Sequence, residues 1–421
     1  MRVTAETTGQ IYTPPVKVWN KMFISIFFAN MVMNMAVKMS NASLQLFAND
    51  LGAPANEIGI LMSMFAVTAL IFRFIAGPMM NAYSRKIIVL CAMGIFTLTY
   101  LGYALSPVIA GALGMEVIHV LMFFRLLQGI GNAFGNACCM AIVADVLPKE
   151  QFSTGMGFYG WTTIIATAFG PNIGSLTRAS IGVVNTYYVV VVLMIVAMIL
   201  AMQVKEAPHE KVKFKLTPKT MIAREAVLPT AIYFLLSVGY AAMNAFLLVY
   251  GEKRGIAGAS LYFTVYAFAQ LATRPVVGKL ADKYGFVKVT IPSAILTALS
   301  MIMVAHAGNT FFLILAAVVS AAGFGGFQPV VQGLSIKAVG PDRRGSATST
   351  NFIGLDLSSI IAPIICGYVA NITGYVPAMW YAMCVFIVLG LVCTIVFNKK
   401  LTGIEINFLK DQEAKVQEEK E

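Results

Sequence analysis

Residues 204–224 read VKEAPHEKVKFKLTPKTMIAR, the longest strongly polar run between the two ends of this 421-residue chain. Long, mostly apolar segments lie on both sides of the run. A helix needs about 20 apolar residues to cross a bilayer core roughly 30 Å thick. We therefore interpret the run as a tether between two membrane-embedded halves.

The composition excludes a large soluble helical protein. The chain is 58% hydrophobic and only 12% charged, about half the charge of a typical soluble domain. Hydropathy predicts twelve spans, at about residues 22–47, 57–80, 87–108, 117–146, 152–177, 182–203, 224–250, 258–281, 287–306, 310–338, 344–371 and 375–398. We expect an N-terminal segment 1–21, a six-helix bundle 22–203, a linker 204–223, a second bundle 224–398 and a tail 399–421, whose acidic end we expect to be disordered.

The distribution of the net charge of +11 along the chain indicates how the chain crosses the membrane. With both termini in the cytoplasm, 23 of the 30 Lys and Arg residues fall in cytoplasmic segments and 3 in external loops. The remaining four, Lys38, Arg73, Arg125 and Arg274, lie inside predicted spans. This bias follows the positive-inside rule, so we expect a multi-pass protein of the cell membrane with no nucleic-acid partner.

The two halves repeat one another in sequence. Arg73, Gly77, Asn81 and Tyr83 recur 201 residues later as Arg274, Gly278, Asp282 and Tyr284. Internal repeats are typical of secondary transporters, whose two halves rock about a central binding site. The fold class we predict is an all-α membrane protein, with twelve transmembrane helices in two pseudo-symmetric bundles of six.

The loop motif carries a family resemblance. Gly278-Lys-Leu-Ala-Asp282-Lys-Tyr-Gly285 resembles the loop after spans two and eight in the major facilitator superfamily, over about residues 20–398. The first copy departs from the pattern, with Asn81 in place of the acid and Ser84 in place of the second glycine. The resemblance implies a cytoplasmic gate, in which an acid faces the start of a helix in the opposite half. The gate residues we expect are Arg73, Gly77, Asn81, Arg85, Asp145, Arg274, Gly278, Asp282 and Arg344.

A polar stripe follows one face of the first span. Asn30, Asn34, Lys38, Asn41 and Gln45 are spaced by three or four residues, which places them on the same side of a helix. Such a stripe faces a bundle interior or a water-filled cavity. The alternative is hydrogen bonding between neighbouring helices; five residues in register, one of them charged, favour a substrate cavity.

Two further motifs resemble those of proton-coupled exporters. In the fourth span, Arg125-Leu-Leu-Gln128-Gly129-Ile-Gly131 is similar to a family motif whose arginine is implicated in proton transfer. In the fifth span, Gly157, Gly170, Pro171 and Gly174 resemble the antiporter motif, with Ala166 and Ser175 in place of two glycines. Small residues allow close helix approach and proline bends the helix, so this second motif is a packing device.

Asp356 is the acid that the sequence places deepest in a span. An ionised carboxylate there is costly, so it must be paired or carry a proton part of the time. Asp356 and Arg125 are our candidates for proton coupling, with Asn30, Asn34, Lys38, Asn41 and Gln128 as the substrate cavity. A static ion pair between Asp356 and Lys38 is the alternative reading.

We therefore hypothesise a secondary transporter, most like a drug:proton antiporter that exports small organic compounds by alternating access. Its partners would be a small-molecule substrate, protons and the bilayer, and we expect a monomer. An organic-anion importer or exchanger is the alternative, because spans carry more cations than acids; a receptor or scaffold that transports nothing is the alternative of another class. The sequence shows no phosphate loop and no metal-ligand spacing, so we expect no enzyme, cofactor or metal.

Overall fold

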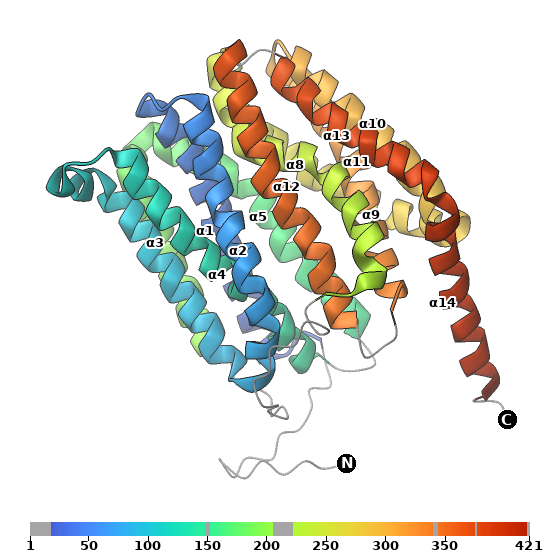
Figure 1. The fold of residues 1–421 in the computed structure, drawn as a ribbon. Helices are drawn as coiled ribbons and strands as arrows, with labels where there is room; N and C mark the ends of the chain where they lie inside the picture. Colours follow the sequence, from blue (N-terminus) through green and yellow to red (C-terminus); the bar gives the residue numbers. More distant parts are fainter. Residues whose placement is uncertain (1–17, 148–151, 205–221, 340–343, 375–376, 419–421) are drawn as a thin grey trace, which may run out of the picture. The chain divides into compact units, whose positions relative to one another are not determined.

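A computed structural model describes residues 18–147, 152–204, 222–339, 344–374 and 377–418. Within these ranges the chain is helical, without a β-strand (Figure 1). The helices are α1 Lys21–Asp50, α2 Ala55–Ala82, α3 Arg85–Leu113, α4 Val117–Val146, α5 Phe152–Ile181, α6 Val183–Met202, η2 Arg224–Ala226, α8 Val227–Lys253, α9 Leu261–Tyr284, α10 Phe286–His306, α11 Thr310–Lys337, α12 Arg344–Thr373, α13 Ala378–Val396 and α14 Asn398–Glu418.

Each predicted span coincides with one long helix, from α1 to α6 and from α8 to α13, which confirms the all-α membrane fold. Over the described ranges, ten helices are long and apolar enough to cross a membrane. The other two predicted spans, α5 and α9, are more polar. Arg274 and Lys279 interrupt the apolar sequence of α9, and Gly, Ser and Thr residues that of α5.

By packing, the chain divides into two compact units, Met1–Ser40 with Ile71–Lys215, and Asn41–Leu70 with Leu216–Glu421. The division cuts α1 after Ser40 and α2 after Leu70, so the α1–α2 turn belongs to the second unit. The predicted bundle boundaries stay a prediction, because packing in one conformation groups helix segments by neighbours and not by sequence repeat. Most of the predicted linker, residues 205–221, lies outside the described residues.

The sequence repeat is also a repeat of packing. In the first unit α3 packs against α4 and α6, and in the second α10 packs in the same way against α11 and α13. Glycines permit the close contact in both units. A Cβ on Gly131 would lie 3.2 Å from the Ala92 carbonyl oxygen, and one on Gly323 would lie 2.6 Å from the Thr297 amide nitrogen. Backbones can approach this closely only where one helix lacks side chains.

We expected the acidic end of the tail to be disordered. This expectation is wrong for residues up to Glu418, because they belong to the helix α14 (Figure 1). Leu401 is fully buried, and the Lys337 ammonium lies 5.7 Å from the centroid of the Phe408 ring. The backbone N–H of Phe286 donates to both carboxylate oxygens of Glu405, each at 3.0 Å. A carboxylate at a helix start satisfies free N–H groups and complements the helix dipole. These contacts hold residues 401–408, and the helix continues from them into the acidic end as far as Glu418.

Gly59 offers a test of helix approach within the second unit. A Cβ there would lie 2.3 Å from the Pro363 carbonyl oxygen of α12, so α2 or α12 must shift. We expect Gly59→Ala to lower the free energy of unfolding by about 1–3 kcal/mol, the usual cost of overpacking. The measurement is thermal unfolding of the purified protein in detergent.

The matched control is Gly94→Ala in α3, where a Cβ would meet nothing within 4 Å. This change should be neutral or slightly stabilising, because alanine has fewer unfolded conformations to lose. Equal destabilisation by the two variants would contradict the predicted contact between α2 and α12.

Candidate functional site

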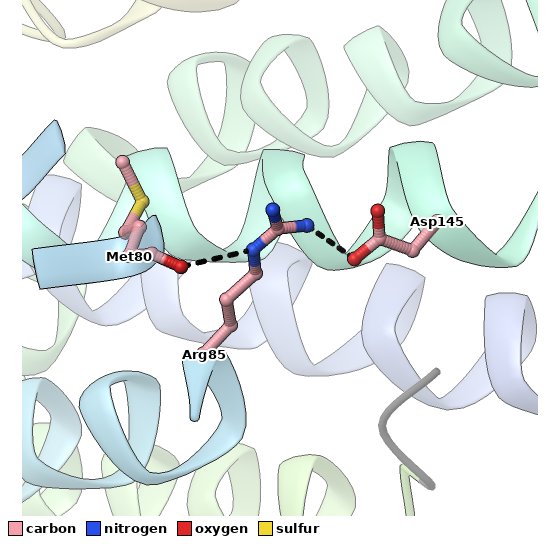
Figure 2. Close-up of polar contacts among 3 residues, drawn as sticks. All are labelled: Met80, Arg85 and Asp145. Atoms are coloured by element: carbon pink, nitrogen blue, oxygen red, sulfur yellow. Dashed lines mark hydrogen bonds and ion pairs between the residues drawn. The ribbon is translucent and has the colours of Figure 1, made fainter. Parts of the chain in front are cut away.

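Arg85, the first residue of α3, ties together the ends of two other helices (Figure 2). Its Nη1 forms an ion pair with Asp145 Oδ2 near the end of α4. Its Nε donates to the carbonyl oxygen of Met80 in the last turn of α2, at 3.3 Å. Both partners carry negative charge or partial charge at helix C-termini, which a cation stabilises. Two of the predicted gate residues, Arg85 and Asp145, are thus in direct contact.

Neighbouring side chains satisfy the ends of further helices in the same unit. Lys86 Nζ donates to the carbonyl oxygen of Met202 at the end of α6, at 2.6 Å. Asn20 Nδ2 donates to the carbonyl oxygen of Val146 at the end of α4, at 3.0 Å. The last carbonyls of a helix lack intrahelical partners. Side chains at the beginnings of α1 and α3 therefore donate hydrogen bonds to carbonyl oxygens at the ends of α2, α4 and α6.

The structure describes the other predicted gate residues in less detail. Arg73 and Arg274 are half-buried, in α2 and α9, and Gly278 is exposed. The side chains of Gly77, Asn81, Asp282 and Arg344 lie outside the described part of the structure, although their backbones are helical. Their role as a gate stays a prediction.

The polar stripe of α1 is hydrogen-bonded to its neighbours along much of its length. In the first unit, Asn30 Nδ2 donates to Thr162 Oγ1 at 2.6 Å and Asn34 Nδ2 donates to Asn136 Oδ1 at 3.0 Å. In the second unit, Gln45 Nε2 donates to the Asn244 carbonyl oxygen at 3.1 Å. Lys38 and Asn41 are half-buried between these bonded positions. The bonds give Asn30, Asn34 and Gln45 a packing role, and lining a cavity stays a prediction.

The antiporter-like motif brings α5 against α1 at the charged residue of the stripe. A Cβ on Gly170 would lie 2.6 Å from the Cβ of Lys38 and 3.3 Å from the Met39 amide nitrogen. Pro171 and Gly174, which follow on the same helix, are buried. At Gly157, by contrast, a Cβ would meet nothing within 4 Å. Gly170 is therefore the motif glycine that close packing requires, and it positions Lys38.

Arg125 is fully buried in α4, in a pocket of amide and phenol groups. Its Nη1 donates to Gln128 Oε1 at 2.6 Å, and the same oxygen accepts from the Tyr103 hydroxyl at 3.0 Å. Gln128 Nε2 donates to the Tyr100 hydroxyl at 3.4 Å. Tyr187 of α6 also interacts electrostatically with Arg125. The two residues predicted from the RxxQGxG pattern are thus partners, one turn apart on the same helix.

The second unit holds a corresponding cluster on α9 and α11. Arg274 Nη2 of α9 donates to Gln328 Oε1 of α11, at 3.4 Å. Gln270 Nε2 lies 3.5 Å from the same oxygen and donates to the Tyr266 hydroxyl at 3.1 Å. Arg274, like Arg125, is held by a glutamine with a tyrosine close by.

Asp356 lies beside this cluster. It is 6% exposed, in α12, and Tyr233 of α8 interacts electrostatically with both Asp356 and Arg274. Together with Gln270 and Gln328 these residues form what we call the Asp356 cluster, namely Tyr233, Gln270, Arg274, Gln328 and Asp356.

Aromatic rings line the same region of the second unit. Tyr240 stacks on Phe324 with centroids 4.2 Å apart and planes inclined by 4°. Tyr266 lies 5.9 Å from Tyr240, and Phe327 lies 6.3 Å from Tyr233. Stacked rings offer flat apolar faces with polar hydroxyl edges.

Sequence reasoning found Arg274 and Asp356 but missed the glutamines and tyrosines around them. Gln270 precedes Arg274 by four residues, so it lies on the same helix face, and this spacing could have marked it. Tyr233, Tyr240 and Gln328 come from other helices, and no spacing in the sequence connects them to Asp356.

Comparison with known proteins identifies the family. The model of the Major Facilitator Superfamily matches residues 26–262 and 232–416, which together cover most of the chain. The chain belongs to the major facilitator superfamily. It is therefore a secondary transporter of small molecules and a multi-pass membrane protein, and not an enzyme.

Curated relatives and solved structures agree with this assignment. The multi-drug resistance efflux pump PmrA of Streptococcus pneumoniae is 23% identical over 381 residues, 86% of this chain and 92% of the pump. The class H tetracycline resistance protein of Pasteurella multocida is 24% identical, over 77% of this chain and 82% of that protein. The staphylopine export protein of Staphylococcus aureus is 23% identical, over 67% and 71%.

Among solved structures, a mutant of the nucleoside transporter NupG has a TM-score of 0.73 at 14% identity, over 89% of this chain and 99% of that one. A mutant of the peptide transporter POT, in complex with sulfate, has a TM-score of 0.76 at 12% identity, over 93% and 97%. At these identities the likeness concerns the fold alone.

The Arg85–Asp145 pair predicts a measurable coupling. The side chains are 16% and 26% exposed, so water screens the pair only in part. We expect Arg85→Ala to lower the free energy of unfolding by about 1–3 kcal/mol, because Asp145 and the Met80 carbonyl lose a charged donor. Thermal unfolding of Arg85→Ala, Asp145→Asn and the double variant measures the interaction energy.

The double variant should lose less stability than the two single losses combined, since both remove the same contact. Lys21→Ala, at an exposed cation of the same unit, is the control and should change stability little. Strict additivity of the two single effects would show that the pair contributes nothing.

Proposed function

We propose that this transporter is a proton-coupled exporter of small organic compounds in the cell membrane, acting as a monomer with both termini in the cytoplasm. The observation that carries the proposal is the burial of the acid Asp356 within α12, in the same unit as the Arg274–Gln328 hydrogen bond. Three relatives have names that refer to efflux, export or drug resistance, which supports the direction of transport.

Asp356 has the environment that a proton-coupling acid needs. It is buried, so its ionised form depends on neighbouring charge and on hydrogen-bond donors. When Asp356 is ionised, it balances the positive charge of Arg274 and attracts a cationic compound. When Asp356 takes up a proton, it no longer attracts a cationic compound, and the positive charge of Arg274 is no longer balanced. Proton and cationic substrate then compete for one carboxylate, and their binding is linked in both directions.

The stacked aromatic rings of the second unit suit a planar organic substrate. Tyr240, Phe324 and Tyr266 lie in the same unit as Asp356, with two rings stacked face to face. Aromatic faces bind apolar planes and also attract cations, by about 0.5–2 kcal/mol per contact. The substrate class we propose is therefore planar or amphiphilic compounds, with a cationic group directed to Asp356.

The first unit would contribute a second buried polar group to the transport mechanism, Arg125. Arg125 donates to Gln128, whose side-chain oxygen also accepts from the Tyr103 hydroxyl. We assign Arg125 to proton transfer together with Asp356, and Lys38, Asn41, Asn30 and Asn34 to the substrate cavity. The predicted gate residues, with the Arg85–Asp145 pair among them, would close the cytoplasmic side.

The test uses purified transporter in liposomes that enclose a pH-sensitive dye. Ethidium, a planar cation, and salicylate, a planar anion, are added in turn across an imposed proton gradient. We expect ethidium to trigger proton movement in the wild type. Asp356→Asn should reduce it by about 5- to 150-fold, the range of typical coupling free energies, while the protein stays folded in the membrane.

Asp50→Asn is the matched control, because Asp50 is an exposed acid at the end of α1 and should retain coupling. Salicylate-driven proton movement that survives in Asp356→Asn but is lost in Lys38→Ala would replace the proposal with an organic-anion transporter. Flux of ethidium without proton movement in the wild type would refute proton coupling.

A further inference from the structure

A groove lies on the second unit where α9 and α10 diverge. It is a cavity of about 530 Å³ with α11 at its base. The side chains that line it are mostly apolar, among them Val276, Leu280, Pro292 and Leu296. Val276 and Leu280 are 57% and 40% exposed, so the groove is open to the surroundings of the helices. None of its lining residues belongs to the Asp356 cluster.

The connection between the two helices explains the groove. Gly285 alone separates α9 from α10, with a φ of 85° that favours glycine. The chain therefore reverses sharply at one residue. Both helices pack extensively on α11 but only slightly on each other, and this leaves a wedge between them.

The narrow end of the wedge at Gly285 is positively charged. Lys288, in the first turns of α10, is the charged side chain among the lining residues, and Tyr284 lines the groove beside it. The Lys283 ammonium lies 5.2 Å from the centroid of the Tyr284 ring. Glu405, the described acid at this end, accepts from the Phe286 N–H. Its carboxylate is therefore committed to the start of α10.

We propose that the groove binds an anionic phospholipid, with an acyl chain between α9 and α10 and the phosphate against Lys288 and Tyr284. The apolar lining matches a hydrocarbon chain, and the hydroxyl and ammonium groups at one end match a phosphodiester. In the proposed orientation this end faces the cytoplasmic leaflet, where anionic lipids attract lysine by about 1 kcal/mol per residue.

The experiment measures lipid binding to the purified, delipidated full-length protein by native mass spectrometry. The probes are phosphatidylglycerol and phosphatidylcholine with identical acyl chains. We expect tighter binding of phosphatidylglycerol by the wild type, and a loss of about fivefold in Lys288→Ala. The affinity for phosphatidylcholine should stay the same in that variant.

Two further variants separate the groove from general surface charge. Lys279→Ala removes an exposed lysine of α9 that does not line the groove, and should leave binding unchanged. Ala272→Phe fills the groove without changing charge, and should weaken binding of both lipids. Equal losses in Lys279→Ala and Lys288→Ala, equal affinity of the wild type for the two lipids, or unchanged binding in Ala272→Phe would each overturn the proposal. Proton coupling plays no part in this readout.

Discussion

Polar groups that lack a partner within their own helix must find one elsewhere, and this constraint governs how the helices of this transporter end. The last carbonyls of α2, α4 and α6 are met by Arg85, Asn20 and Lys86, all of which lie at or next to the beginning of another helix. In the second unit, Glu405 of α14 meets the first N–H of α10. Side chains at the beginning of one helix thus bind the backbone groups at the end of another. The basic residues that follow the positive-inside rule therefore also act as helix caps.

The same constraint shapes the two arginines buried within spans. Arg125 and Arg274 are each held by a glutamine whose surroundings include tyrosine. A glutamine amide oxygen accepts from a guanidinium without adding a second charge to the interior. The first cluster involves α4 and its neighbours α3 and α6. The second joins α9 and α11 and lies near Asp356 of α12. An acid near the second arginine is what makes the second unit the stronger candidate for proton coupling.

Glycine allows the helices to come close enough for these contacts. Gly131 and Gly323 occupy corresponding places in the two units, where α4 meets α3 and α11 meets α10. Gly170 does the same where α5 meets α1 beside Lys38. The wedge between α9 and α10, with Lys288 at its narrow end, is a feature of the second unit that the repeat alone does not predict.

The sequence by itself determined the twelve helices, the polar linker and the repeat, because hydropathy and spacing along one helix are local properties. It also picked out Arg125 with Gln128, which are three residues apart, and the arginine and acid of the second half. Tertiary structure alone decided that Arg274 contacts Gln328, that Arg85 reaches Asp145, and that the first part of α14 packs through Glu405 and Leu401. These contacts join residues from separate helices. Which helix faces which depends on close packing of complete side-chain surfaces, and no single stretch of sequence contains that information.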